Sequence, residues 1–310
     1  MAPADGGAAG GKGEAARTWT SRLWPAAAFQ FCFIAAVAML KPGANALTLS
    51  RFNSGALPWL YMAAAVIAGG LALLGGEGKR RRHPGYLVLT GALISLLLAA
   101  GLWLELPLVA LAAYLFSEAF ATQVSLAFWG SMGEAFDARE ARKAFSWING
   151  IGMSGAIAGG FLAQVLARTA GALALLVAGG VFLIGAGVAW RFHRPELDQV
   201  APARGAAIRR AGWREVLLAP YTQLLGVLVL GLSLLQQLTD YVFRERAAQR
   251  LLEADMADLF AAHQLWTGVF CVAFQFFLAE LLLRKLGILK YAAVVPATLA
   301  ALTVAAWAIP

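Results

Sequence analysis

The stretch 146-SWINGIGMSGAIAGG-160 has glycines at Gly150, Gly152 and Gly155, the G-x-G-x-x-G spacing of dinucleotide-binding loops. That interpretation requires a strand before the glycines, but the charged segment 134-EAFDAREARKAF-145 precedes them. Small residues instead recur at every fourth position: Gly152, Ala156 and Gly160, and again Gly155, Gly159 and Ala163. Because this pattern lets helix backbones approach closely in lipid, we interpret the stretch as the packing surface of a membrane helix.

Composition agrees with a membrane environment. The chain has 310 residues, of which 60% are hydrophobic and 14% charged, and its mean hydropathy is +0.70. Soluble domains carry about 25% charged residues, so lipid must be part of the solvent of this chain. Both cysteines, Cys32 and Cys271, lie in apolar runs without metal-ligand spacing. We therefore expect neither a metal site nor a bound cofactor.

Nine stretches approach the roughly 20 apolar residues that cross a bilayer. They lie at 25–47, 57–75, 86–104, 107–133, 145–167, 172–190, 217–239, 265–283 and 291–309. The first is interrupted by 41-KPG-43, and the Gly/Ala-rich residues 1–23 before it are predicted to form a flexible tail. The sequence thus predicts an all-α, polytopic helical bundle.

Basic residues are distributed unevenly between the two sides of this bundle. Of the 25 lysines and arginines, 19 fall on the side of the N-terminus and five on the other. Cytoplasmic loops carry such an excess, so we expect the N-terminus to be cytoplasmic. The net charge of +8 then reflects membrane topology and does not indicate a nucleic-acid partner.

The longest polar connection, 191–216, separates a six-helix half at 24–190 from about three further helices at 217–310. Six helices, a basic cytoplasmic linker and a second set form the layout of the major facilitator fold. Nine spans do not complete two sets of six, so we expect a partial chain lacking about three helices. The charged stretch 244–263 is predicted to form a separate surface helix on the outer side.

Ionisable residues inside spans are costly and usually functional. Lys41 precedes Pro42 and Gly43, which can interrupt a helix, and Glu118 lies well inside the fourth span. Two structural alternatives stay open. Lys41 could extend to the interface from a shortened helix, and Glu118 could serve a helix-to-helix hydrogen bond.

The outer end of the seventh span carries Asp240 and Arg244 beside Gln236. These residues are substrate-binding candidates, with an interfacial ion pair between positions four apart as the alternative for the two charges. Trp129 in the fourth span is a further binding candidate, although a core aromatic is the favoured interpretation of it.

The segment 118-EAFATQVSLAFWGSMGEAFDAREARKAFSWINGIG-152 resembles the nucleotide translocase family, the ATP/ADP exchangers of plastids and intracellular bacteria. The matching positions are Glu118, Ser125, Phe128, Trp129, Gly130, Glu134 and the run 140–145. The stretch 40-LKPGANALTLS-50 has the family's lysine as Lys41 but lacks the aspartate that follows it in the family. The stretch 238-LTDYVFR-244 has an acid, Asp240, and a base, Arg244, where the family also has an acid and a base. The resemblance implies that Lys41, Glu118 and Asp240 are the transport-critical charges.

These observations predict a multi-pass transporter that moves an anionic metabolite by alternating access. Nucleotides are the substrate class that the resemblance implies, and we expect the protein in a bacterial inner membrane. The rival hypothesis is a transporter-like anchor or sensor for a cytoplasmic regulatory domain. We do not expect an enzyme, because the sequence shows no catalytic triad, phosphate-binding loop or polar cluster at an interface.

Overall fold

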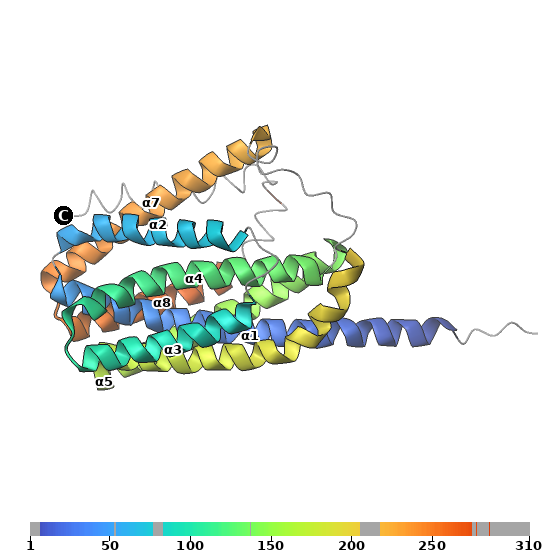
Figure 1. Ribbon diagram of the computed structural model, residues 1–310, viewed down its shortest axis with the longest axis horizontal. Helices are drawn as coiled ribbons and strands as arrows, with labels where there is room; N and C mark the ends of the chain where they lie inside the picture. Colours follow the sequence, from blue (N-terminus) through green and yellow to red (C-terminus); the bar gives the residue numbers. More distant parts are fainter. Residues whose placement is uncertain are drawn as a thin grey trace, which may run out of the picture. The chain divides into compact units, whose positions relative to one another are not determined.

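The structure, a computed structural model, describes residues 7–52, 54–76, 83–136, 138–204 and 218–274, together with residues 277 and 285. All regular secondary structure in these residues is helical (Figure 1). The chain divides into two compact units: residues 1–206 with 252–270, and residues 207–251 with 271–310. The first unit contains most of the described helices and is the subject of the following paragraphs.

Helix α1 (Gly7–Arg51) is continuous through both of its prolines, Pro25 and Pro42. It therefore differs from the sequence-based expectation twice, because part of the expected tail at 1–23 is helical and 41-KPG-43 does not interrupt the helix. A proline is tolerated inside a membrane helix where neighbouring helices surround the freed backbone groups. Pro42 and Gly43 are both buried by such neighbours.

Three apolar helices follow α1. A short 3-10 turn, η1 (Ser54–Ala56), leads into α2 (Leu57–Gly76), which is followed by α3 (Pro84–Trp103) and α4 (Pro107–Ala135). Both α3 and α4 have proline in their first turn, where the missing N–H costs no hydrogen bond. Helix α2 packs against α4. The three helices match the predicted second, third and fourth spans closely.

Helix α5 (Ala138–Arg204) consists of two helical segments that meet at Gly171. Gly171 has φ 78° and ψ −178°, a conformation that is essentially restricted to glycine. Gly159, before this break, lies against Ala35 of α1, and Gly179, after it, lies against Leu40. The two segments thus correspond to the predicted spans 145–167 and 172–190. The second continues to Arg204, well into the expected linker 191–216, while residues 205–217 lie outside the described residues.

Helices α7 (Pro220–Arg250) and α8 (Glu253–Ala273) are separated only by two residues, Leu251 and Leu252. The stretch 244–263 therefore forms no separate surface helix, contrary to our expectation. Its first part completes α7 and its second part begins α8, because Leu251 adopts an extended conformation between them (φ −124°, ψ 151°). Glu253 and Asp255 in the first turn of α8 favour a helix start at this point.

Five described helical segments are long and apolar enough to cross a membrane. They are Thr20–Arg51, Pro84–Trp103, Leu108–Ala135, Lys143–Phe192 and Thr222–Arg250, and a shorter apolar helix covers Leu57–Leu73. These lengths and compositions confirm the coarser prediction of a helical bundle suited to a membrane. The predicted ninth span at 291–309, and the end of the eighth at 275–283 except for residue 277, lie outside the described residues.

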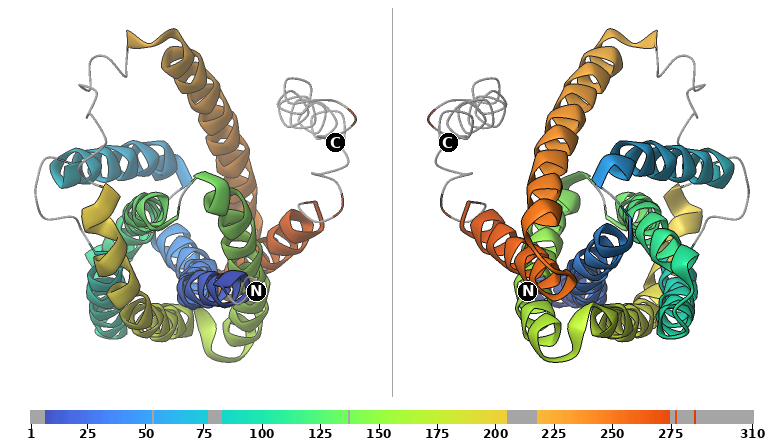
Figure 2. Two further views of the ribbon diagram at one scale, coloured as in Figure 1. Left: turned by 90° about the vertical axis from the view of Figure 1, so that its right-hand side faces the viewer. Right: turned by 90° about the vertical axis from the view of Figure 1, so that its left-hand side faces the viewer.

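Helix α1 is the central element of the first unit. It packs against α4 and against both segments of α5, and Figure 2 shows it in blue between these helices. Many of its residues are fully buried, among them Ala26, Ala35 and Met39. Arg22 holds the first part of α1 against the connection between α4 and α5, donating to the Ala135 carbonyl oxygen at 2.8 Å and pairing with Glu140 at 3.5 Å.

Helix α8 is attached to the first unit by polar contacts and by small residues. Asp258 accepts a hydrogen bond from Arg168 of α5 at 2.9 Å, and Glu253 accepts one from Ser50 of α1 at 2.7 Å. A Cβ added at Gly160 would lie 2.6 Å from the backbone nitrogen of Leu265, so the two helices touch through their backbones. Residues 252–270 thus join the first unit, although α7 and α8 are neighbours in sequence.

Candidate functional site

Two of the charges predicted from the sequence, Lys41 of α1 and Glu118 of α4, meet in the first unit. The distance between Lys41 Nζ and Glu118 Oε2 is 2.7 Å, although the residues are 77 positions apart in the chain. Their side chains keep 26% and 20% of their surface exposed. The pair is therefore partly withdrawn from solvent and still open to a solute.

The ion pair is the end of a polar strip between α1 and α4, formed by Lys41, Asn45 and Thr48 of α1 with Ala110, Tyr114 and Glu118 of α4. Thr48 Oγ1 donates to the Ala110 carbonyl oxygen at 3.0 Å. Lys41 precedes Thr48 on α1, whereas Glu118 follows Ala110 on α4, so the two helices are antiparallel here. Asn45 and Tyr114 therefore lie between the two contacts, and both side chains are buried. The strip offers amide and hydroxyl groups next to a cation and an anion.

Sequence reasoning missed Asn45, Thr48 and Tyr114. The signal that could have found them is helical spacing, because residues three, four and seven apart share a face of a helix. Asn45 and Thr48 lie four and seven positions after Lys41, and Tyr114 lies four before Glu118.

Helix α1 contains a proline beside the ion pair. Because Pro42 has no backbone N–H, the carbonyl group of Ala38 has no intrahelical donor at that position. A carbonyl released in this way can bind a polar solute in a cavity between membrane helices. Lys41 and the Ala38 carbonyl group thus lie within about one turn of α1, and Glu118 of α4 pairs with the lysine there.

The electrostatics of the Lys41–Glu118 pair allow each residue to exchange its partner for another. A charge held away from water is costly unless a partner compensates it, so Lys41 and Glu118 hold one another in place. An anion that binds Lys41 must compete with Glu118, and Glu118 then needs a new partner or a proton. The arrangement can therefore couple binding of an anion to rearrangement of α1 against α4.

Trp129 belongs to an aromatic cluster on α1, α4 and α5. Its ring contacts those of Phe128 and Phe145 edge-on, at centroid distances of 5.2 and 5.3 Å, and Phe128 stacks on Phe29 at 4.9 Å. Trp129 lies 11 positions after Glu118, which corresponds to about 16 Å along a helix. The structure thus brings Trp129 together with core aromatics and not with the polar strip.

Asp240, Arg244 and Gln236 lie on α7, in the second unit. Arg244 Nη2 and Asp240 Oδ2 are 2.8 Å apart, as an i,i+4 pair within one helix. Gln236 lies one turn before Asp240 on the same helix. The structure thus brings Asp240 and Arg244 together within the unit that contains α7.

The glycines of the opening stretch lie inside α5, where it crosses α1 and α8. A Cβ added at Gly159 would lie 2.5 Å from the Ala35 carbonyl oxygen, one at Gly152 2.5 Å from Gln30 Cγ, and Gly155 is against the backbone of Phe31. Gly160 faces Leu265 in the same way. Helix backbones approach here so closely that any side chain would require a shift.

Comparison of the chain with protein-family models, with curated proteins and with solved structures finds no match. In the described part of the chain, no group of three or more His, Cys, Asp or Glu side chains could hold a metal ion. Helix composition and length define the class: an all-helical protein with the helices of a multi-pass membrane protein.

Proposed function

We propose that this protein is a membrane transporter that moves an anionic metabolite by alternating access. The observation that carries the proposal is the Lys41–Glu118 ion pair, which lies between two helices of membrane-spanning composition and beside the proline in α1. Charges in such helices are costly, and they commonly mark substrate or ion pathways. The major facilitator layout that the sequence predicts agrees with this proposal, and the resemblance to nucleotide translocases makes nucleotides the substrate class to test first.

The proposed mechanism is an exchange of partners at Lys41. In the resting state Glu118 compensates the lysine, and a substrate phosphate or carboxylate replaces it during transport. A ligand shifts a conformational equilibrium only if it binds one state more tightly than the other. In this proposal, the replacement of Glu118 by the substrate at Lys41 provides that difference in affinity. Under this proposal the N-terminus is cytoplasmic, as the distribution of basic residues favours. The proposal also assigns the protein to a bacterial inner membrane.

Transport by reconstituted protein tests the proposal. Vesicles containing the full chain are assayed for uptake of radiolabelled nucleotides and organic anions, with wild type, Lys41→Ala and Lys41→Arg in parallel. We expect Lys41→Ala to abolish uptake and Lys41→Arg to retain part of it. The matched control is Arg191→Ala, at an exposed position of α5. Uptake by Lys41→Ala at the wild-type rate would exclude the proposed role of the lysine.

A binding experiment separates a ligand role from a structural one. Glu118→Gln removes the competitor for Lys41, so anions should raise the thermal stability of this variant more than that of wild type. Transport by the same variant should fall, because the carboxylate no longer restores the resting state. Asp255→Asn, at an exposed position of α8, is the control for loss of a carboxylate. An anion response that is equal in wild type and Glu118→Gln would contradict the exchange of partners.

A further inference from the structure

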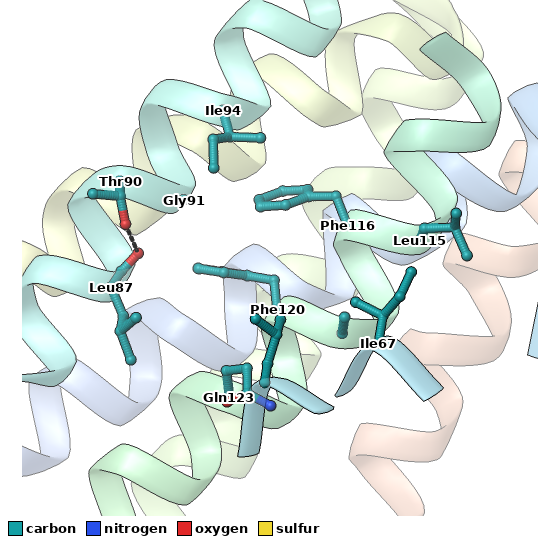
Figure 3. Close-up of a pocket in the computed structure, with 11 residues that line it drawn as sticks. Ile67, Leu87, Thr90, Gly91, Ile94, Leu115, Phe116, Phe120 and Gln123 are labelled. Carbon is teal, nitrogen blue, oxygen red and sulfur yellow. Dashed lines mark hydrogen bonds between the residues drawn. The ribbon is translucent and has the colours of Figure 1, made fainter. Parts of the chain in front are cut away.

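A pocket of about 310 Å³ lies among α2, α3 and α4, all in the first unit. It is lined by Ile67, Leu71, Leu87, Thr90, Gly91, Ile94, Leu115, Phe116, Ala119, Phe120 and Gln123 (Figure 3). The residues of α4 that line it belong to a different face of the helix from Tyr114 and Glu118, which face α1. The pocket is therefore distinct from the polar strip.

The pocket has a buried floor and an exposed rim. Gly91, Ala119 and Gln123 are buried, whereas Ile67 and Ile94 are 39% and 42% exposed. Both rim residues lie on apolar helices of the kind that face lipid. The entrance is thus framed by side chains that suit hydrocarbon and not water.

The polar side chains of the wall are bonded to backbone carbonyl groups. Thr90 Oγ1 donates to Tyr86 and Leu87 of its own helix at 2.9 Å, and Gln123 Nε2 donates to Ala68 of α2 at 2.8 Å. The remaining wall consists of aliphatic and aromatic carbon. A ligand that fits this surface must be apolar along the part that enters.

Two aromatic rings shape the interior. Phe116 and Phe120 of α4 stack at a centroid distance of 4.9 Å and project toward α3 (Figure 3). Phe120 lies directly over Gly91, where no side chain could be added without moving the ring. Gly91 therefore allows the Phe120 ring to pack closely on α3, and α3 and α4 together form this part of the pocket wall.

We propose that this pocket binds one acyl chain of a bilayer phospholipid, which enters sideways between α2 and α3. Helix α2 packs mainly on α4, so hydrocarbon from the bilayer can reach the gap beside it. The volume of about 310 Å³ is about twice that of the 150 Å³ cavity that accommodates benzene, so the pocket has room for a segment of hydrocarbon chain. An acyl chain has the required length, flexibility and lack of polar groups, and it is present wherever such helices lie in a membrane.

Photolabelling of the full chain tests this proposal. The protein is reconstituted in vesicles of phosphatidylethanolamine and phosphatidylglycerol that contain a phospholipid with a diazirine midway along one acyl chain. Labelled residues are identified by mass spectrometry of peptides. We expect labelling to concentrate on the α3 and α4 residues of the pocket, above the level at Val66, which is 74% exposed on α2.

Blocking variants sharpen the test. Ile67→Trp fills the mouth from an exposed position, and Val66→Trp places the same side chain next to it but outside the pocket. Excluding even two methylene groups weakens binding roughly tenfold, so Ile67→Trp should lower pocket labelling by about that factor and Val66→Trp should not. Ala119→Phe fills the floor and should do the same, with the exposed Ala112→Phe as its control.

Three results would overturn the proposal. Pocket labelling could equal that at Val66, it could persist unchanged in Ile67→Trp, or it could occur only with a free fatty-acid analogue and not with the phospholipid. Size-exclusion profiles of Ile67→Trp and Val66→Trp check that both variants are folded. Since both positions are exposed, we expect both to elute as wild type.

Discussion

The contacts of α1 with α5 differ in kind from its contacts with α4. Toward α5, Ala35 and Phe31 lie with their backbones against Gly159 and Gly155. Toward α4, Lys41 and Thr48 make an ion pair and a hydrogen bond to groups that could bind other partners. At these positions the α5 side depends on close packing, and the α4 side depends on polar contacts.

This difference suits a helix that must be fixed on one side and adjustable on the other. Close backbone packing is lost entirely when a side chain intervenes, so it tolerates no alternative arrangement. A polar contact can be exchanged for another with a small net change in free energy. Substitutions on the two sides should therefore have effects of different size and kind.

The largest effect is expected on the α5 side. Gly159→Leu would place a side chain where the Ala35 carbonyl oxygen lies 2.5 Å from an added Cβ, so the helices must separate. We expect a loss of more than about 3 kcal/mol in the free energy of unfolding, measured by thermal unfolding in detergent. Gly69→Leu in α2, where an added Cβ meets no atom within 4 Å, is the control. Equal stability of the two variants would contradict the packing role.

The Lys41–Glu118 pair should give the next largest effect. Lys41→Met leaves the carboxylate without its cation, at an expected cost of about 1–3 kcal/mol. The double variant Lys41→Met, Glu118→Leu should recover most of that stability, because neither charge then needs compensation. Thermal unfolding of the two single variants and the double variant measures the coupling. Additive losses would show that the pair contributes no mutual stabilisation.

A smaller effect is expected at the other end of the polar strip. Thr48→Val keeps the branched shape and removes the hydrogen bond to the Ala110 carbonyl oxygen. We expect a loss of about 1 kcal/mol, seen as a lower melting temperature. Thr169→Val serves as the control, because the Thr169 hydroxyl is exposed and bonds only within its own helix, to Val165. If the Thr48 hydroxyl joins α1 to α4, Thr48→Val should have a lower melting temperature than Thr169→Val.

The smallest effect is expected for the pair between Arg168 and Asp258. Its distance of 2.9 Å resembles that of the Lys41 pair, but the arginine side chain is 62% exposed. Exposed pairs contribute about 0.2–1 kcal/mol, and salt screens them. Arg168→Gln should therefore lower stability slightly at low ionic strength, and the difference should vanish in high salt. A large, salt-independent loss would show that exposure does not determine the strength of these pairs.

Hydrophobic length predicted most of the fold. The spans at 57–75, 86–104 and 107–133 agree with α2, α3 and α4 because each is bounded by turn-forming or charged residues. Proline misled the prediction in α1, since the burial that makes Pro42 tolerable is a property of the assembled bundle. The charged stretch 244–263 misled it as well, because local amphipathic character does not specify where one helix ends and the next begins.

The candidate site was partly predictable. Lys41 and Glu118 stand out as charges inside apolar segments, and both match the family pattern that the sequence resembles. That they bond to one another depends on how α1 and α4 pack, which no local pattern encodes. The pocket among α2, α3 and α4 was not predictable for the same reason, since its lining comes from three helices.

The break at Gly171 has a consequence for biosynthesis. A reversal made at one glycine leaves only a few polar residues, Arg168 among them, between two apolar segments within Lys143–Phe192. The two segments run in opposite directions along α1, so insertion into a membrane would have to leave both ends of the pair, near Lys143 and Phe192, on the same side. The basic residues at the two ends would then share one side of the membrane, and Arg168 near the tip would lie on the other.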